Sequence, residues 1–176
     1  MVESYLRNMQ ASDLERVWQW RNHPEVRRFM FTTHEILWDE HLSWFRQAQA
    51  SSSVKLLIYE IENVAVGFAS LKMVHSEGVA DWGFYLDPNA PRGSGRGLGE
   101  SVIRHGFQDL SLHKLCGQAL AFNERSIAFH RSLGFREEGR LREQHFDGQR
   151  YHDVLCFGLL KADWLPNETV KNHENT

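Results

Sequence analysis

A glycine-rich segment near the middle of the chain has the composition of an anion-binding turn. It contains Gly93, Gly95 and Gly97, flanked by Arg92 and Arg96, and it follows an apolar run that predicts a strand. Glycine lets the backbone approach a ligand closely, and the first N–H groups of a helix have no partner within the helix. Such a turn before a helix suits a pyrophosphate, and a flexible glycine loop without a ligand is the alternative.

Two other phosphate-binding motifs do not fit this segment. A dinucleotide-binding fold places Gly-x-Gly-x-x-Gly near its first strand, with an acidic residue about twenty positions later. Here the loop follows the fourth predicted strand instead. A Walker loop requires Gly-Lys-Ser or Gly-Lys-Thr, which the sequence lacks.

A second group of polar residues falls on one face of a predicted helix. Asn123, Ser126 and His130 are spaced i, i+3 and i+7, so their side chains share one side of a helix over residues 123–133. Taken without a motif, His130 is interpreted as a half-buried helix residue.

The hydrophobic pattern predicts the elements that position these groups. We expect one domain over residues 1–164 and a loose polar tail over 165–176. The first helix is expected to begin in a capping box at Ser12 and Glu15 and to end before Pro24. Strands are expected at 4–9, 54–61, 64–74, 79–86, 114–122, 135–146 and 150–160, and further helices around 38–50, 97–110 and 123–133.

The resulting order, β-α-α-β-β-β-α-β-α-β-β, predicts an α/β (α+β) domain with a central mixed, mostly antiparallel sheet flanked by helices. The formal charge of −3 argues against nucleic acid as a partner. Neither a signal peptide nor an apolar run of membrane-spanning length is visible, so we expect a cytoplasmic protein without a membrane partner. The ten histidines include no His-Glu-x-x-His or paired metal spacing, so no metal is expected.

Together the two motifs resemble those of the GNAT superfamily of N-acetyltransferases. That family binds the pyrophosphate of acetyl-CoA with Arg/Gln-x-x-Gly-x-Gly/Ala, and residues 92–97 match this pattern. Its helix motif, Asn-x-x-Ser-x-x-x-Tyr-x-x-x-Gly-Phe, is matched by residues 123–135, with His130 in place of the tyrosine. The order of predicted elements agrees from Ser4 to Leu160, so the resemblance covers nearly the whole chain.

The resemblance implies acetyl-CoA as co-substrate and direct transfer of its acetyl group to an amine. His130 would protonate the departing thiolate, and Asp81 would help to deprotonate the acceptor, with a strand-edge carboxylate as the alternative for Asp81. A backbone N–H near Tyr85 or Leu86 would hold the oxyanion. The cofactor-binding residues that the resemblance implies are Tyr85, Leu86, Arg92, Gly93, Gly95, Arg96, Gly97, Asn123, Ser126 and His130.

The N-terminal third is expected to bind the acceptor, because its aromatic and basic residues could stack a base or sugar and hold phosphate. A buried aromatic core with solvated arginines is the alternative. The segment resembles the N-acetyltransferases of pseudaminic-acid biosynthesis, which acetylate the 4-amino group of UDP-4-amino-4,6-dideoxy-N-acetyl-β-L-altrosamine, a precursor used in flagellin glycosylation. That resemblance implies a nucleotide-sugar pocket formed by Arg21, Met30, Phe31, His41 and Tyr85.

Other acceptors stay open at this point. Acetyltransferases that act on ribosomal-protein N-termini or on polyamines share both cofactor motifs. The arginines at positions 21, 27 and 28 suit a diphosphate better than a polycation. A non-catalytic module that binds acetyl-CoA is the alternative of a different class, and a homodimer is a further possibility that the sequence leaves open.

Overall fold

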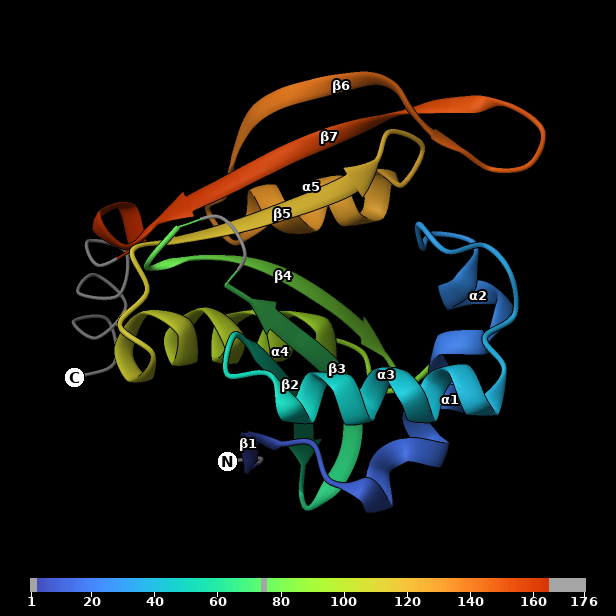
Figure 1. The fold of residues 1–176 in the computed structure, drawn as a ribbon. Coiled ribbons are helices and arrows are strands. Elements are labelled where there is room, and N and C mark those ends of the chain that lie inside the picture. Colours follow the sequence, from blue (N-terminus) through green and yellow to red (C-terminus); the bar gives the residue numbers. More distant parts are fainter. Residues whose placement is uncertain (1–2, 74–75, 165–176) are drawn as a thin grey trace. The chain divides into compact units, whose positions relative to one another are not determined.

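The computed structural model describes residues 3–73 and 76–164. Figure 1 shows the helices and strands of the chain, which divides into two compact units. Unit 1 comprises Met1–Lys72 and Trp82–Val102, and unit 2 comprises Met73–Asp81 and Ile103–Thr176. The tail predicted over residues 165–176 lies outside the described residues, as do the last residue of the third predicted strand and the residue that follows it.

Seven strands pair in the order β1-β2-β3-β4-β5-β7-β6. Strands β4 and β5 pair in parallel, whereas β1–β2, β2–β3, β5–β7 and β6–β7 are antiparallel. The predicted mixed, mostly antiparallel sheet is therefore confirmed. The strands are β1 (Ser4–Asn8), β2 (Val54–Ile61), β3 (Val64–Lys72), β4 (Val79–Leu86), β5 (Lys114–Leu120), β6 (Arg136–Phe146) and β7 (Tyr151–Leu160).

The long helices also lie close to their predicted positions. They are α1 (Leu14–Asn22), α3 (Trp38–Ala50), α4 (Ser94–Arg104) and α5 (Glu124–Ser132). The short helix α2 (Pro24–Arg27) was not predicted. Pro24 ends α1 as expected, but its fixed φ also suits the first position of a new helix, and His23 Nδ1 accepts a bond from Glu25 N at 3.2 Å.

Two helix starts differ from the prediction. The predicted capping box at Ser12 and Glu15 is wrong. The chain turns earlier, in the 3₁₀ turn η1 (Ala11–Asp13), and Gln10 is its N-cap. The Asp13 carboxylate accepts a bond from Gln10 N at 2.9 Å. Helix α4 starts at Ser94 rather than at residue 97, and it continues into the π-helical η2 (His105–Asp109).

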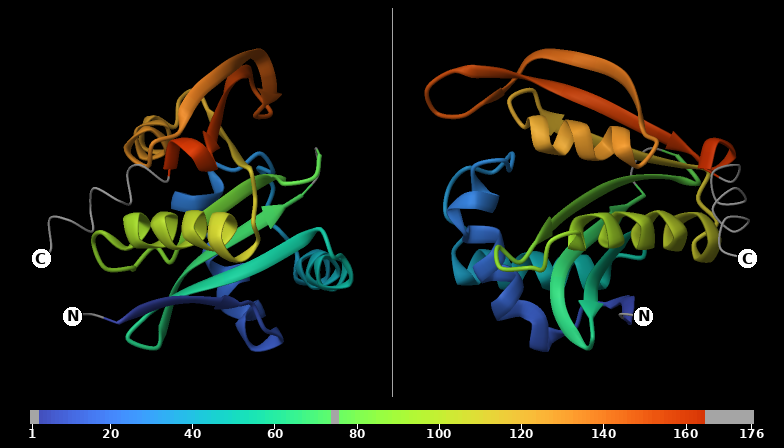
Figure 2. Two further views of the ribbon diagram at one scale, coloured as in Figure 1. Left: turned by 90° about the vertical axis from the view of Figure 1, so that its left-hand side faces the viewer. Right: turned by 180° about the vertical axis from the view of Figure 1, so that it is seen from behind.

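Unit 1 packs helices on both faces of its strands. Alternate residues of β2 point to opposite faces, so Leu56 and Ile58 enter one core while Leu57 and Tyr59 face the other side. Helices α1 and α3 cover the first face, and Figure 2 shows α4 on the opposite face from α3. The core under α1 and α3 contains Met9, Leu14, Val17, Trp20, Phe45, Ala48, Leu56, Ile58, Ala65 and Phe68.

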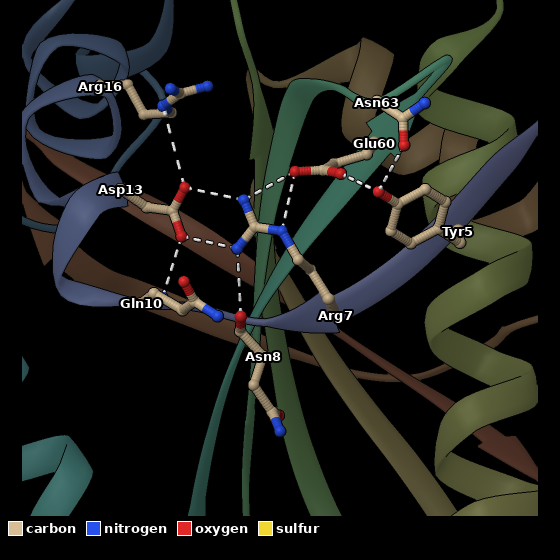
Figure 3. Close-up of polar contacts among 8 residues, drawn as sticks. All are labelled: Tyr5, Arg7, Asn8, Gln10, Asp13, Arg16, Glu60 and Asn63. Atoms are coloured by element: carbon tan, nitrogen blue, oxygen red, sulfur yellow. Dashed lines mark hydrogen bonds and ion pairs between the residues drawn. The ribbon is translucent and has the colours of Figure 1, made fainter.

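One arginine ties β1, β2 and η1 of unit 1 together, as Figure 3 shows. Arg7 donates to both carboxylate oxygens of Asp13, at 2.7 and 2.9 Å, and its Nε donates to Glu60 at 2.7 Å. Asp13 and Glu60 are only 2% and 6% exposed. Tyr5 also donates to Glu60. Burial alone would raise the pKa of each carboxyl, but the bonds outweigh burial and both pKa values lie below their ordinary range.

Unit 2 is built on the long β6–β7 hairpin, which lies beside β5 in Figure 1. Asp147 closes the hairpin turn by accepting bonds from Gln149 N and Arg150 N at 2.8 and 2.9 Å. Helix α5 packs against β5 and β6. The buried face includes Leu115, Phe157 and Leu159 from the strands, and Ile127 and His130 from α5. The hairpin predicted around Asp147 and Gly148 is confirmed.

Candidate functional site

The glycine-rich loop of unit 1 runs over residues 87–93 between β4 and α4. Asp87 N bonds Val66 O at 2.9 Å, and its carboxylate accepts from Asn89 N at 2.8 Å, which starts the turn. Ser94 closes it, because both its N and its Oγ donate to Pro91 O, at 3.2 and 2.7 Å. The loop is thus held by its own backbone, and the first turn of α4 begins where the sequence motif predicts the anion.

Gly93 gives this loop its open surface. Its φ of +89° lies in the region that favours glycine, and a Cβ placed there would meet no heavy atom within 4 Å. Arg92 is exposed beside it, and Arg96 is ion-paired with Glu100 at 3.0 Å. Free space, backbone N–H groups and the positive end of α4 suit a pyrophosphate, so the donor set fits acetyl-CoA.

Gly97 differs from Gly93 in what surrounds it. A Cβ at Gly97 would lie 2.2 Å from Tyr59 Oη and 3.1 Å from Tyr59 Cζ, closer than side chains pack. This glycine therefore makes room for a tyrosine from β2 within the same unit. Tyr59 was not predicted as part of the site, because Tyr59 and Gly97 are far apart in the chain and share no motif.

Arg21, predicted to bind the acceptor, has a donor that the protein does not use. Its Nη2 donates to Thr32 O at 3.1 Å. Its Nη1 is buried and has no hydrogen-bond partner among the residues that the structure describes. Burial lowers the pKa of Arg21, partly offset by its electrostatic interaction with Tyr85. Buried polar atoms are nearly always paired, so an unpaired guanidinium nitrogen indicates a place for an external acceptor atom.

Tyr85 lies at the end of β4, beside this guanidinium. Its ring packs on Phe68 with ring centroids 4.9 Å apart. Burial raises the pKa of Tyr85 well above its ordinary value, with Arg21 opposing that rise. The phenol is therefore neutral at any physiological pH. Leu86, the next residue, points to the other face, where it lies against Gly67. Arg21 and Tyr85 thus lie close enough for their charges to interact, and their place in an acceptor pocket stays a prediction.

The other three residues predicted for that pocket have different surroundings. Met30 is partly buried, and Phe31 is 46% exposed on the segment between α2 and α3. His41 is only 4% exposed, donates from Nε2 to Leu14 O at 2.9 Å and stacks on Trp44 with centroids 5.1 Å apart. Burial lowers the pKa of His41, which keeps it neutral. Its contacts are those of a core residue.

Unit 2 contains the predicted helix face, and its polar groups bond within the helix. Asn123 caps α5 by accepting from Ser126 N at 3.1 Å. His130 is 1% exposed, donates from Nδ1 to Ser126 O at 2.8 Å and stacks on Phe157 with centroids 4.7 Å apart. Burial lowers the pKa of His130, so the imidazolium form needed for the predicted acid is disfavoured. This environment favours the packing interpretation.

Asp81, the predicted base, also belongs to unit 2. It is half-buried in β4 and is paired with Cys116 across the parallel β4–β5 ladder. Burial, the largest cause, raises the pKa of the Cys116 thiol, and the nearby Asp81 charge adds to that rise. A protonated thiol is a poor nucleophile, which agrees with a mechanism that does not use cysteine.

The described residues also bear on metal sites and membrane spans. No group of three or more His, Cys, Asp or Glu side chains in this part of the chain is arranged to hold a metal ion. None of the helices in residues 3–73 and 76–164 is long and apolar enough to cross a membrane.

Known proteins resemble this chain over most of its length. Residues 4–136 match the family model described as the acetyltransferase (GNAT) domain. The SPbeta prophage-derived uncharacterized N-acetyltransferase YokL of Bacillus subtilis is 27% identical over 127 residues, 70% of this chain and 71% of that protein. Acetyltransferase PseH of Campylobacter jejuni is 25% identical, over 72% of this chain and 79% of that protein.

A solved structure shares the fold. The crystal structure of spermidine N-acetyltransferase from Vibrio cholerae in complex with CoA and spermine superposes with a TM-score of 0.84 at 22% identity. The match covers 92% of this chain and 98% of that one.

Proposed function

Because the chain belongs to the GNAT acetyltransferase family, and so is an acetyl-CoA-dependent N-acetyltransferase, we propose that its acceptor is a nucleotide-linked amino sugar. The proposed reaction acetylates the 4-amino group of UDP-4-amino-4,6-dideoxy-N-acetyl-β-L-altrosamine. The resemblance of the N-terminal segment to the pseudaminic-acid enzymes supports this acceptor, as does the match to PseH over 72% of the chain.

The observation that carries the proposal is the buried, unpaired Nη1 of Arg21. A guanidinium donor bonds best to carboxylate, phosphate or carbonyl oxygens. A nucleotide diphosphate offers many such oxygens, whereas a polyamine offers only more positive charge. We assign this donor to an oxygen of the nucleotide part of the acceptor, with the neutral Tyr85 phenol beside it.

Two carboxylates in the segment between α1 and α3 also fit an anionic acceptor. Glu25 pairs with Arg28 at 3.0 Å and Glu35 with Arg27 at 3.9 Å. Each of these two negative charges therefore has an arginine partner within the protein. A site built for a polycation would instead leave carboxylates open to the ligand.

The proposed chemistry gives each of the candidate residues a separate role. The loop around Gly93 and the start of α4 hold the pyrophosphate of acetyl-CoA, which supplies the activated acetyl group. The acceptor amine must be neutral to attack, and Asp81 is the proposed base for its proton, directly or through water. Backbone N–H groups near Tyr85 and Leu86 are the proposed oxyanion donors. We propose that His130 orders α5 by packing and does not act as the acid.

A panel of acceptors tests the proposal. Consumption of acetyl-CoA is measured with the UDP-linked 4-amino sugar, the same amino sugar without UDP, spermidine and an N-terminal peptide of a ribosomal protein. We expect the UDP-linked sugar to be acetylated at least about a hundredfold faster per unit concentration than the free sugar, because binding of the remote nucleotide positions the amine. Preference for spermidine or the peptide would contradict the acceptor, and no turnover with any amine would indicate a non-catalytic module.

A further inference from the structure

The first turn of α4 rests on the side chain of Tyr59. Tyr59 is 3% exposed and lies in β2, on the face opposite the core under α1 and α3. Its hydroxyl lies so close to Gly97 that it occupies the space where a Cβ would be, 2.2 Å from the ideal position. The contact is backbone against phenol, and both residues belong to unit 1.

The same turn is hydrogen-bonded to the glycine loop. Arg96 N and Gly97 N both approach Gly93 O, at 3.1 and 3.5 Å, so Gly97 belongs to the bond network that fixes Gly93. A shift of the helix away from β2 at Gly97 would strain these bonds and displace Gly93. The contact between Tyr59 and Gly97 therefore bears on where the glycine loop lies in unit 1.

We propose that Tyr59 is a positioning residue for acetyl-CoA. Its phenol supports the first turn of α4 through Gly97, and the bonds from Arg96 N and Gly97 N to Gly93 O pass this support on to the glycine loop that the pyrophosphate would contact. The proposal rests on the acetyl-CoA part of the proposed function and is independent of the acceptor. The motif implies that Gly97 allows close approach to a phosphate. The proposal gives Gly97 a different role, which is to leave space for the Tyr59 phenol.

A pair of substitutions separates this role from general packing. Gly97→Ala places a methyl group against the Tyr59 hydroxyl, and Tyr59→Phe removes that hydroxyl. In the double variant, the atom nearest the new methyl group is the ring carbon at 3.1 Å, which requires a shift of only a few tenths of an ångström. Gly139→Ala is the matched control, because a Cβ at Gly139 meets nothing within 4 Å.

Binding of acetyl-CoA to the full chain is measured by calorimetry, and KM and kcat are measured for acetyl-CoA and for S-acetylpantetheine, which lacks the pyrophosphate. Gly97→Ala should weaken acetyl-CoA by about tenfold or more, the equivalent of about 1.4 kcal/mol. The double variant should recover to within about threefold of wild type, the equivalent of about 0.7 kcal/mol. KM for S-acetylpantetheine and kcat at saturation should change little, because only the binding of the pyrophosphate is expected to weaken.

Each outcome decides the proposal. Normal acetyl-CoA affinity in Gly97→Ala, or a double variant no better than Gly97→Ala, would overturn it. If Gly97→Ala does not fold, Tyr59→Phe decides alone: a raised KM for acetyl-CoA with an unchanged KM for S-acetylpantetheine supports the proposal, and two unchanged values overturn it. Failure of the wild type to bind acetyl-CoA would instead contradict the proposed function itself.

Discussion

Two arginines of unit 1 have the same side chain in opposite situations. Arg7 uses its guanidinium on Asp13 and Glu60, so its charge is matched within the protein. Arg21 makes one bond, to Thr32 O, and keeps a buried Nη1 without a partner among the described residues. The bonds of Arg7 are made within the protein, whereas the unpaired donor of Arg21 costs free energy until a ligand supplies the missing acceptor. The difference separates structural residues from binding residues where residue type alone cannot.

The largest effect is expected at the satisfied arginine. Arg7→Met removes the cation that the two buried carboxylates share, so the free energy of unfolding should fall by about 3 kcal/mol, the lower end of the range for breaking a buried pair because Arg7 itself is partly exposed. Urea unfolding followed by circular dichroism measures this, with Arg16→Met as the control, because Arg16 is 47% exposed and lies 3.8 Å from Asp13. A loss in Arg7→Met no larger than in Arg16→Met would show that the cluster in Figure 3 is not structural.

The glycine loop before α4 should be sensitive to negative charge at Gly93. Gly93→Asp and Gly93→Asn carry the same backbone strain, since both side chains tolerate positive φ better than most. The aspartate also repels the pyrophosphate, so we expect it to weaken acetyl-CoA about tenfold more than the asparagine does, the equivalent of about 1.4 kcal/mol. Calorimetry at low salt measures the ratio. Equal affinities of the two variants for acetyl-CoA would contradict the assignment of the pyrophosphate to this turn.

The decrease in the free energy of unfolding at acid pH should depend on Arg7. The pKa values of Asp13 and Glu60 are lowered, so their contribution is complete above the unfolded carboxyl pKa of about 4 and is lost as pH falls below it. Without Arg7, one cause that lowers both pKa values is lost, so the two carboxyls contribute less stability that can be lost on protonation. The unfolding free energy of Arg7→Met should therefore decline less between pH 5 and pH 3 than that of wild type. Parallel curves for the two proteins would contradict this account.

The smallest effect is expected at a motif residue that is already satisfied. His130 is buried and bonded to Ser126 O, so His130→Phe keeps the stacking on Phe157 and loses one hydrogen bond. If the residue only packs, kcat should stay within about threefold of wild type, below the range of about 10²–10⁴-fold that general acids supply. A loss in that range, together with a changed pH profile of kcat, would restore the acid role.

Much of this fold could be predicted from local pattern. Strands β2 and β4 and helix α3 agree with the apolar periodicity because burial of one face decides them. The cap at Gln10 could not be predicted from local sequence. Asp13, which accepts from Gln10 N, is held by a bond from Arg7, and Arg7 in turn bonds to Glu60 on another strand. The contact of Tyr59 with Gly97 is likewise a product of packing between distant segments.

The candidate site could be predicted in part for the same reason. Residue type and resemblance predicted Arg21 in the acceptor pocket. Its unpaired nitrogen is consistent with a binding role, which stays a prediction. The same reasoning placed His41 there and gave His130 an acid role. Only the structure shows that both imidazoles are buried and bonded to carbonyl oxygens. A motif specifies which residues are present, whereas the hydrogen bonds show which of them remain available to a ligand.

The specificity of Arg21→Met tests the central claim most directly. The measurement is the ratio of kcat/KM for the UDP-linked amino sugar to kcat/KM for the same sugar without UDP. Loss of a hydrogen bond from a charged group costs about 1.5–3 kcal/mol, so the ratio should fall by about tenfold or more. The unfolding free energy should change by less than about 1 kcal/mol, because the guanidinium lacks a full set of protein bonds. Arg28→Met, exposed and paired with Glu25, should leave the ratio unchanged. An unchanged ratio in Arg21→Met would contradict the assignment of this donor to a nucleotide-linked acceptor.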